Sequence, residues 1–131
     1  MTIEKHFLPY NFCCLSPEFS SYPISNIVIF PVPYDGTTSY HSGTREGPKA
    51  IIMASRFLEL FDETFNRELH QVGIHTLDEL EPDVSGPEAT IRQVREVTTY
   101  HLQQNKTVLM LGGEHSLSSG AARAFYDHFP G

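Results

Sequence analysis

The sequence has 131 residues, with 9 Lys and Arg against 16 Asp and Glu, so its formal net charge is −7 when the histidines are neutral. Hydrophobic residues make up 40% of the chain, which is enough to build a folded core and excludes the disordered and collagen-like classes of protein. The acidic balance argues against a nucleic-acid partner, because affinity for nucleic acids comes largely from Lys and Arg side chains that neutralise phosphates.

The apolar stretches and the cysteines predict a cytoplasmic protein. The longest apolar stretches, at residues 27–33 and 107–111, are far too short to cross a bilayer. Residues 1–10 lack the basic segment and apolar run that mark a secretory signal. The only two cysteines, Cys13 and Cys14, are adjacent and form no Cys-x-x-Cys pair, so we expect reduced thiols. From the length we expect a single domain over residues 1–131, and from the short apolar stretches we expect no membrane contact.

The first clear element is a strand. Residues 1–25 hold scattered aromatic side chains without a sustained period, and we expect them to wrap over the domain. Residues 26–33 form an apolar run typical of a parallel strand buried on both faces, which Pro31 and Pro33 are expected to end. Residues 34–47 are too rich in Gly, Ser and Thr for a regular element, and they predict a long functional loop.

Helices and strands alternate in the rest of the chain. The elements expected there, in order, are a helix from Gly47 to about residue 60, a brief strand or irregular ribbon within 61–80, a turn at 83–86, a helix at 87–104, a strand at 107–111 and a helix at about 116–128. Pro48 and Pro87 lie where proline favours the start of a helix. This order predicts the α/β class with a parallel sheet.

The sharpest motif follows the strand at 107–111, where residues 109–116 read Leu-Met-Leu-Gly-Gly-Glu-His-Ser. Ligands bind at the carboxyl ends of parallel strands, and the two glycines allow a tight turn into the next helix. This placement brings Glu114 and His115 to a crevice, where neutral imidazole is a common ligand of manganese, zinc or iron. The alternative is a turn without a ligand, and in either case Ser116 is the expected N-cap of the last helix.

The loop at residues 35–47 lies on the same edge of the predicted sheet. Its hydroxyls, carboxylates and His41 are candidates to line the crevice; the alternative is a packed loop whose Asp and Thr side chains satisfy local amides. Arg45 is expected to pair with a local carboxylate rather than with a substrate. The histidines expected to be structural are His6, His70, His75, His101 and His128.

Three motifs together resemble a known family. The chain reads Pro-Tyr-Asp-Gly-Thr-Thr over 33–38, Gly-Thr-Arg-Glu-Gly-Pro-Lys-Ala-Ile-Ile over 43–52 and Leu-Gly-Gly-Glu-His-Ser over 111–116. In this order and spacing they resemble the ureohydrolase family of arginases and agmatinases, the agmatinase branch most of all. The resemblance implies a three-layer α/β/α fold with a parallel central sheet, a two-manganese (Mn²⁺) centre, and hydrolysis of a guanidinium group to urea and an amine.

The resemblance also assigns one metal ligand. The histidine of the family's Gly-Gly-(Asp/Glu)-His motif binds manganese and corresponds to His115, whereas Glu114 stands where the family often has Asp. The family's Asp-Ala-His-x-Asp and Asp-x-Asp motifs, which supply further ligands, have no counterpart up to Gly131. Catalytic and substrate-binding residues are therefore not identified, and we expect the sheet to be incomplete on its C-terminal side.

Two hypotheses follow from these observations. The first is an agmatinase-like ureohydrolase that converts agmatine to putrescine and urea in polyamine metabolism. It would act on a small guanidino substrate, with guanidinobutyrate, arginine and formiminoglutamate as the alternatives to agmatine, and form a homo-oligomer in the complete family member. The 131-residue chain alone is expected to be inactive, because one histidine cannot hold two manganese ions. The second is a truncated, non-catalytic fragment or an interaction partner of full-length subunits, with an exposed sheet edge.

Overall fold

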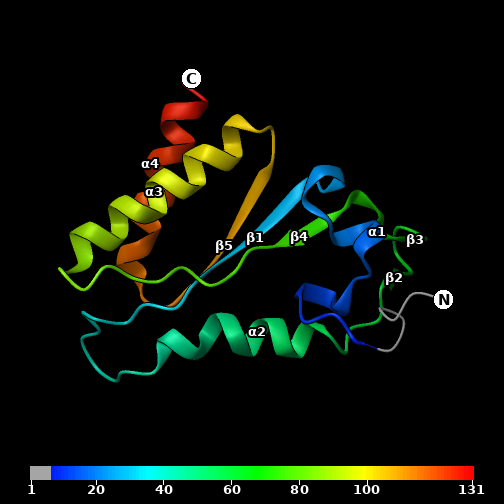
Figure 1. Cartoon of the computed structure of the whole chain (residues 1–131), viewed down its shortest axis with the longest axis horizontal. Helices are drawn as coiled ribbons and strands as arrows, with labels where there is room; N and C mark the ends of the chain where they lie inside the picture. The colour runs from blue at the N-terminus through cyan, green and yellow to red at the C-terminus, as the bar shows by residue number, and fades with distance from the viewer. Residues whose placement is uncertain (1–6) are drawn as a thin grey trace.

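Three parallel strands form the centre of the structure, a computed structural model that describes residues 7–131. They are β1 (Ile27–Val32), β4 (Ile74–Thr76) and β5 (Thr107–Gly112), and they lie in the order β4-β1-β5 (Figure 1). The register of β1 and β5 runs from Ile27 opposite Thr107 to Val32 opposite Gly112. The carboxyl ends of these two strands therefore lie side by side.

Helices cover both faces of this sheet. Figure 1 shows α2 (Gly47–Ser55) on one face and the packed pair α3 (Pro87–Gln103) and α4 (Ser118–His128) on the other. The chain passes from β1 through α2 to β4 on one side of β1, and then through α3 to β5 on the other side. This arrangement confirms the predicted α/β class and the three-layer α/β/α fold with a parallel central sheet.

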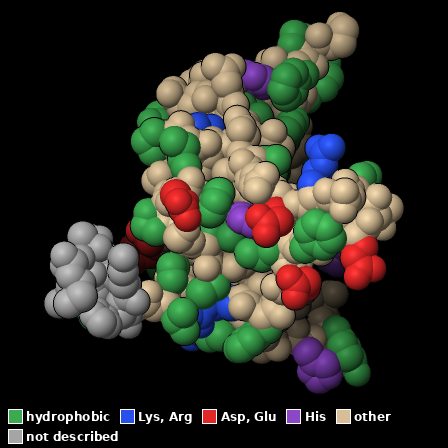
Figure 2. All heavy atoms as spheres, turned by 90° about the vertical axis from the view of Figure 1, so that its right-hand side faces the viewer, with side chains coloured by type: hydrophobic (Ala, Val, Ile, Leu, Met, Phe, Trp, Pro, Cys, Tyr) green, Lys and Arg blue, Asp and Glu red, His purple; other side chains and the backbone are tan. Residues whose placement is uncertain are grey.

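The shorter elements lie mainly at the amino ends of the strands. They are the helix α1 (Pro17–Ser20), the strands β2 (Phe61–Asp62) and β3 (Arg67–Glu68), and the 3-10 helices η2 (Phe12–Cys14), η3 (Tyr22–Ile24), η4 (Thr44–Glu46), η5 (Leu69–Val72) and η6 (His115–Leu117). The end of the molecule with the β2–β3 hairpin presents hydrophobic side chains in separate groups between acidic ones (Figure 2). Among residues 7–131, no helix combines the length and the apolar character that a membrane span requires.

Burial on both faces of β1 explains why its sequence is continuously apolar. The main core cluster on the side of α3 and α4 consists of Phe30, Val32, Val94, Leu102, Val108, Leu117 and Ala124. Alternation along the strand places Ile29 on the opposite face, where α2 contributes the buried Ile52. The predicted buried strand is therefore confirmed.

Pro31 does not end β1, contrary to the prediction, because the strand continues to Val32. The Pro31 carbonyl accepts the N–H of Leu80 at 3.0 Å, so the backbone of Pro31 faces the β4 side of the strand. On that side β4 has already ended at Thr76. The missing N–H of proline therefore removes no bond from the strand pairing.

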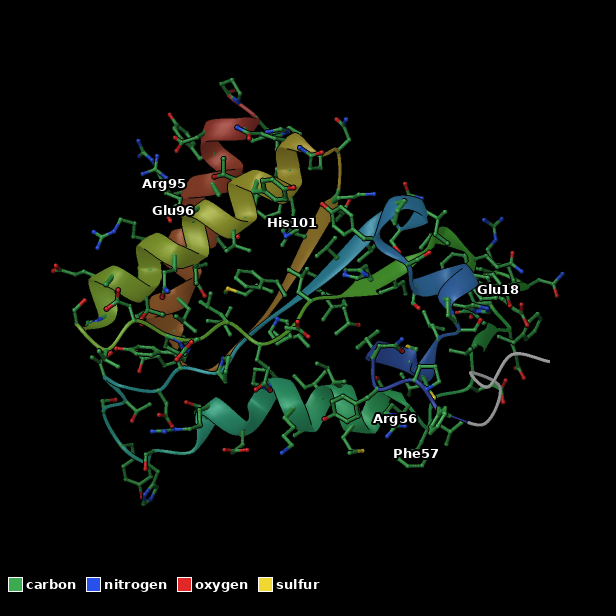
Figure 3. All side chains as sticks on the ribbon, in the orientation of Figure 1. Glu18, Arg56, Phe57, Arg95, Glu96 and His101 are labelled. Atoms are coloured by element: carbon green, nitrogen blue, oxygen red, sulfur yellow. The ribbon has the colours of Figure 1, made fainter. Side chains whose placement is uncertain are left out.

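The helix α2 ends at Ser55, earlier than predicted. The Ser55 hydroxyl donates to the Ile52 carbonyl at 2.7 Å and accepts the N–H of Cys13 at 2.9 Å. Such a side-chain bond competes with the regular helical bonds, and here it ties the helix end to the lead-in segment. Phe57, just beyond the helix, points away from the sheet and is 83% exposed (Figure 3).

The lead-in segment and residues 61–80 both reach the central sheet. Phe12 donates its N–H to the Thr76 hydroxyl at 3.0 Å, which is consistent with the expectation that residues 1–25 wrap over the domain. The brief strand expected within 61–80 is β4, which pairs with β1 from Ile27 opposite Ile74 onward. The sequence pattern did not identify this segment as the third strand of the sheet.

Of the histidines expected to be structural, the four that the structure describes lie away from the end of the sheet where the crevice was predicted. His101 is buried between α3 and the strands, with its Nδ1 2.8 Å from the Tyr22 hydroxyl (Figure 3). Burial, and then the neighbouring His75 and Lys106, lower the pKa of His101. The other three histidines also contact neighbouring residues. The His70 ring contacts Phe19 and the His128 ring contacts Phe129. His75 hydrogen-bonds to the Ser20 carbonyl, and its ring contacts Tyr22. His6 lies outside the described residues.

The close contact between α3 and α4 generates a stability prediction. A Cβ added at Gly120 would lie 2.4 Å from the carbonyl oxygen of Ile91, so the helices would have to separate. We expect G120A to lower the free energy of unfolding by about 1–3 kcal/mol, as overpacking does, in urea denaturation. G47A is the matched control, because its Cβ would come no closer than 3.4 Å to a neighbouring atom. If both variants lost the same free energy of unfolding, the close contact between the helices would not be the cause.

Candidate functional site

A cavity lies at the carboxyl ends of β1 and β5. The connection after β1 leads to α2 on one face of the sheet, and the connection after β5 leads to α4 on the other. Such a switch in direction leaves a crevice, which is where open α/β sheets bind ligands. The cavity has a volume of about 410 Å³ and is lined by residues 37–41, Thr44 and residues 113–116.

The turn after β5 places His115 at this cavity. The backbone N–H of Glu114 donates to the Tyr34 carbonyl at 3.0 Å, so the turn lies against the end of β1. A Cβ at Gly113 would lie 1.9 Å from the same carbonyl oxygen, and only glycine allows this approach. His115 begins η6 with an exposed side chain that lines the cavity. The predicted placement of Glu114 and His115 at the carboxyl edge is confirmed.

Ser116 is not the N-cap of the last helix, contrary to the prediction. It lies inside η6, which precedes α4, and the residue before η6 is Glu114 in an extended conformation. The Ser116 hydroxyl donates to the Glu114 carboxylate at 2.5 Å and makes no capping bond. The additional 3-10 turn therefore displaces the expected cap.

Asp35 closes the loop that forms the other wall of the cavity. Its side chain is 1% exposed and accepts the N–H of Gly43 at 2.6 Å and the Nε–H of Arg45 at 2.7 Å. The hydrogen bond from Arg45, followed by that from Gly43, lowers the pKa of Asp35. The expected pairing of Arg45 with a local carboxylate is confirmed. Asp35 also satisfies local amides, as predicted by the alternative in which this segment is a packed loop.

Glu114 connects this loop to the turn that carries His115. Its carboxylate accepts the N–H of Thr37 at 2.8 Å and the hydroxyls of Thr37 and Ser116. Burial opposes ionisation of Glu114, but the hydrogen bonds from Ser116 and Thr37 together outweigh it and lower the pKa. Burial, and then the charge of Glu114, raise the pKa of Tyr34. The contact with Thr37 joins residues 77 positions apart, and no local signal in the sequence identifies it.

The described residues do not form a complete metal centre. Within residues 7–131, no group of three or more His, Cys, Asp or Glu side chains is placed to hold a metal ion. The carboxylates of Asp35 and Glu114 are engaged in bonds to the protein. His41 lines the same cavity as His115. These residues do not fit a complete two-manganese site, and the role of His115 as a ligand stays a prediction.

The two adjacent glycines of the turn allow a matched test of its geometry. G113A is expected to lower the free energy of unfolding by about 1–3 kcal/mol and to shift the NMR signals of His115, because backbone must move away from Tyr34. G112A is the control, since its Cβ would meet Leu117 at 3.5 Å, an ordinary contact distance. If the two variants behave alike in urea denaturation and NMR, the close approach to Tyr34 does not position the turn.

The ion pair of Asp35 allows a prediction about the pKa of its carboxyl group. The pKa of the Asp35 carboxyl should lie below the usual value of about 3.9. The stability that the ionised carboxylate contributes is fully present above about pH 3.9 and is lost as the pH falls through the lowered pKa. We expect R45Q to raise the pKa of Asp35 toward 3.9 in a ¹³C NMR titration. K49Q, which removes an exposed cation nearby in the sequence, should leave it unchanged. An unchanged titration in R45Q would refute the role of Arg45.

Comparison with known proteins places these elements in a family. Residues 25–131 match the model of the Arginase family. An N(1)-aminopropylagmatine ureohydrolase of Thermus thermophilus is 39% identical over 104 residues, which cover 79% of this chain and 35% of that protein. The agmatinase of Bacillus subtilis (strain 168) is 25% identical over 130 residues, or 99% of this chain and 44% of that protein.

A solved structure gives the same result. The crystal structure of agmatine ureohydrolase of Thermoplasma volcanium matches with a TM-score of 0.81 and 29% identity, over 93% of this chain and 40% of that one. The chain thus spans 35–44% of the length of these relatives. Because the family model covers β1, the cavity-lining loop and the turn with His115, this chain belongs to the arginase family.

Proposed function

We propose that this chain forms the amino-terminal part of a ureohydrolase that releases urea from a guanidinium group. The observation that carries the proposal is the position of His115 at the cavity between the β1 and β5 ends, in a chain of the arginase family. Several relatives are named for hydrolysis of agmatine or of N(1)-aminopropylagmatine. Such an enzyme is a hydrolase that acts on C–N bonds of linear amidines.

The proposed substrate is agmatine or agmatine with an aminopropyl group, the two compounds for which these relatives are named. Both present a guanidinium group on a short aliphatic chain. Agmatine would give putrescine, and the longer compound would give the corresponding aminopropyl product. The net charge of −7 favours a cationic substrate, although only through weak long-range attraction.

We further propose that His115 supplies one imidazole ligand to a manganese centre. Bound there in the complete enzyme, manganese would supply a water molecule of lowered pKa and a positive charge beside the oxygen that attacks the guanidinium carbon. At the cavity the described residues bring one predicted imidazole ligand, and the nearby carboxylates of Asp35 and Glu114 already accept hydrogen bonds from the protein. We therefore propose that the 131-residue chain alone is inactive.

A second candidate function is a non-catalytic partner of full-length subunits. The observation that favours it is the outer edge of β5, which has no strand partner within residues 7–131. Leu109 on this strand is 50% exposed. Unpaired backbone groups beside apolar side chains provide an edge to which another strand can pair.

Urea release tests the proposed inactivity. The purified 131-residue chain with Mn²⁺ and either agmatine or N(1)-aminopropylagmatine should release no urea above the protein-free rate. Urea production by this chain would contradict the proposal, because it would require metal ligands that residues 7–131 do not provide.

A chimera tests the catalytic part of the proposal. Residues 25–131 would replace the matching segment of the Thermus thermophilus relative, and the chimera should release urea. H115A should then reduce the rate at least a hundredfold, because loss of a ligand should exceed the roughly 10- to 100-fold effects of residues that only support ligands. H128A, at the far end of α4, is the control and should retain activity. A folded chimera with no activity, or equal rates for H115A and H128A, would overturn the proposal.

A further inference from the structure

The Glu114 carboxylate joins two segments that lie far apart in the chain. It accepts the backbone N–H and the hydroxyl of Thr37, in the loop after β1, and the hydroxyl of Ser116, in η6. All three residues line the cavity together with His115. The two walls of the cavity are therefore linked by a side chain that belongs to neither β1 nor β5.

The loop held by Glu114 is itself closed by Asp35. The bonds from Gly43 and Arg45 to the nearly inaccessible Asp35 carboxylate bring residues 35 and 45 together. Because the loop is closed in this way, a bond at Thr37 positions more than a single residue. Asp35 fixes the internal shape of the loop, and Glu114 fixes the loop relative to the turn with His115.

We infer that Glu114 is a positioning residue that sets the distance between His115 and residues 37–41, and hence the space open to a ligand of His115. The inference rests on the proposed function, in which His115 binds manganese. The inferred role depends on the length of the Glu114 side chain as well as on its charge. An Asp at position 114 would keep the charge and the short bond to Ser116, two residues away, but would be too short to hold Thr37.

Amide exchange in the metal-free 131-residue chain tests the link directly. In E114D the N–H of Thr37 should exchange about tenfold faster than in the wild type, because its acceptor has withdrawn. E114Q keeps the length and should exchange more slowly than E114D. The N–H of Gly43, which Asp35 accepts, should be unchanged in both. E96D makes the same change on the outer face of α3 and should have no effect (Figure 3).

Two results of this experiment would overturn the inference. Equal exchange at Thr37 in the wild type and E114D would show that Glu114 does not hold the loop. Equal acceleration at Thr37 and Gly43 would show general loosening of the loop instead of a lost link. E114D and E114Q both retain a polar side chain that can bond to Ser116, so neither removes the turn outright.

Titration with Mn²⁺ alone, in the metal-free chimera described above in which the proposed remaining ligands are present, tests the effect on His115. A paramagnetic ion bound at His115 broadens the NMR signals of nearby nuclei and acts more weakly as distance grows. In the chimera with Glu114 it should broaden His115 and the amides of residues 37–41, and in the chimera with E114D the loop should lose at least half of its broadening while His115 retains it. Unchanged loop broadening in E114D would overturn the inference. No broadening at His115 in any variant would contradict the proposed function instead, and amide exchange would then decide the role of Glu114.

Discussion

The parallel pairing of β1 with β5 is the constraint on which the candidate site depends. Their register, from Ile27 opposite Thr107 to Val32 opposite Gly112, makes the two strands end at the same level. A shift by one residue would exchange the side chains that β1 presents to its two buried faces, so the fit of particular side chains, such as Phe30 in the core on the side of α3 and α4, specifies this register. Just beyond the strand ends, the backbone of Gly113 meets that of Tyr34, and this contact gives the His115 turn a fixed place.

Side-chain pattern was sufficient to predict the elements that bury long apolar faces. The strand β1 and the helix α3 were predicted closely, because their burial demands the same pattern of apolar residues whatever layer they pack against. The strand β5 was also predicted closely from its apolar run, although only Val108 within it is buried. The errors arise where hydrogen bonds between particular residues determine where an element ends. The end of α2 depends on a bond between Cys13 and Ser55, 42 positions apart, and the tolerance of Pro31 depends on where β4 ends. Neither fact is present in the local sequence.

The same distinction applies to the candidate site. Two glycines after a buried strand predict that the next residues reach the carboxyl edge, and His115 lies there. The partner of Arg45 was also predictable in kind, because a carboxylate stands ten residues away in the same loop. The link from Glu114 to Thr37 was not, since it requires the order of the strands as well as their existence. For the same reason the role expected of Ser116 was wrong: its hydroxyl serves this link and caps no helix.

The negative charge next to His115 is used to build the site and is not left free for a cation. Asp35 accepts hydrogen bonds from Arg45 and Gly43, and Glu114 accepts hydrogen bonds from two hydroxyls and a backbone amide. A carboxylate that already accepts three hydrogen bonds has little capacity left for a metal, and each such bond that it gave up would cost about 1.5–3 kcal/mol. The net charge of −7 does not replace these oxygens, because exposed charges beyond about 10 Å are screened. In the proposed enzyme, residues 7–131 would therefore contribute a hydrogen-bonded frame and the His115 imidazole, and the remaining oxygen ligands would come from other segments.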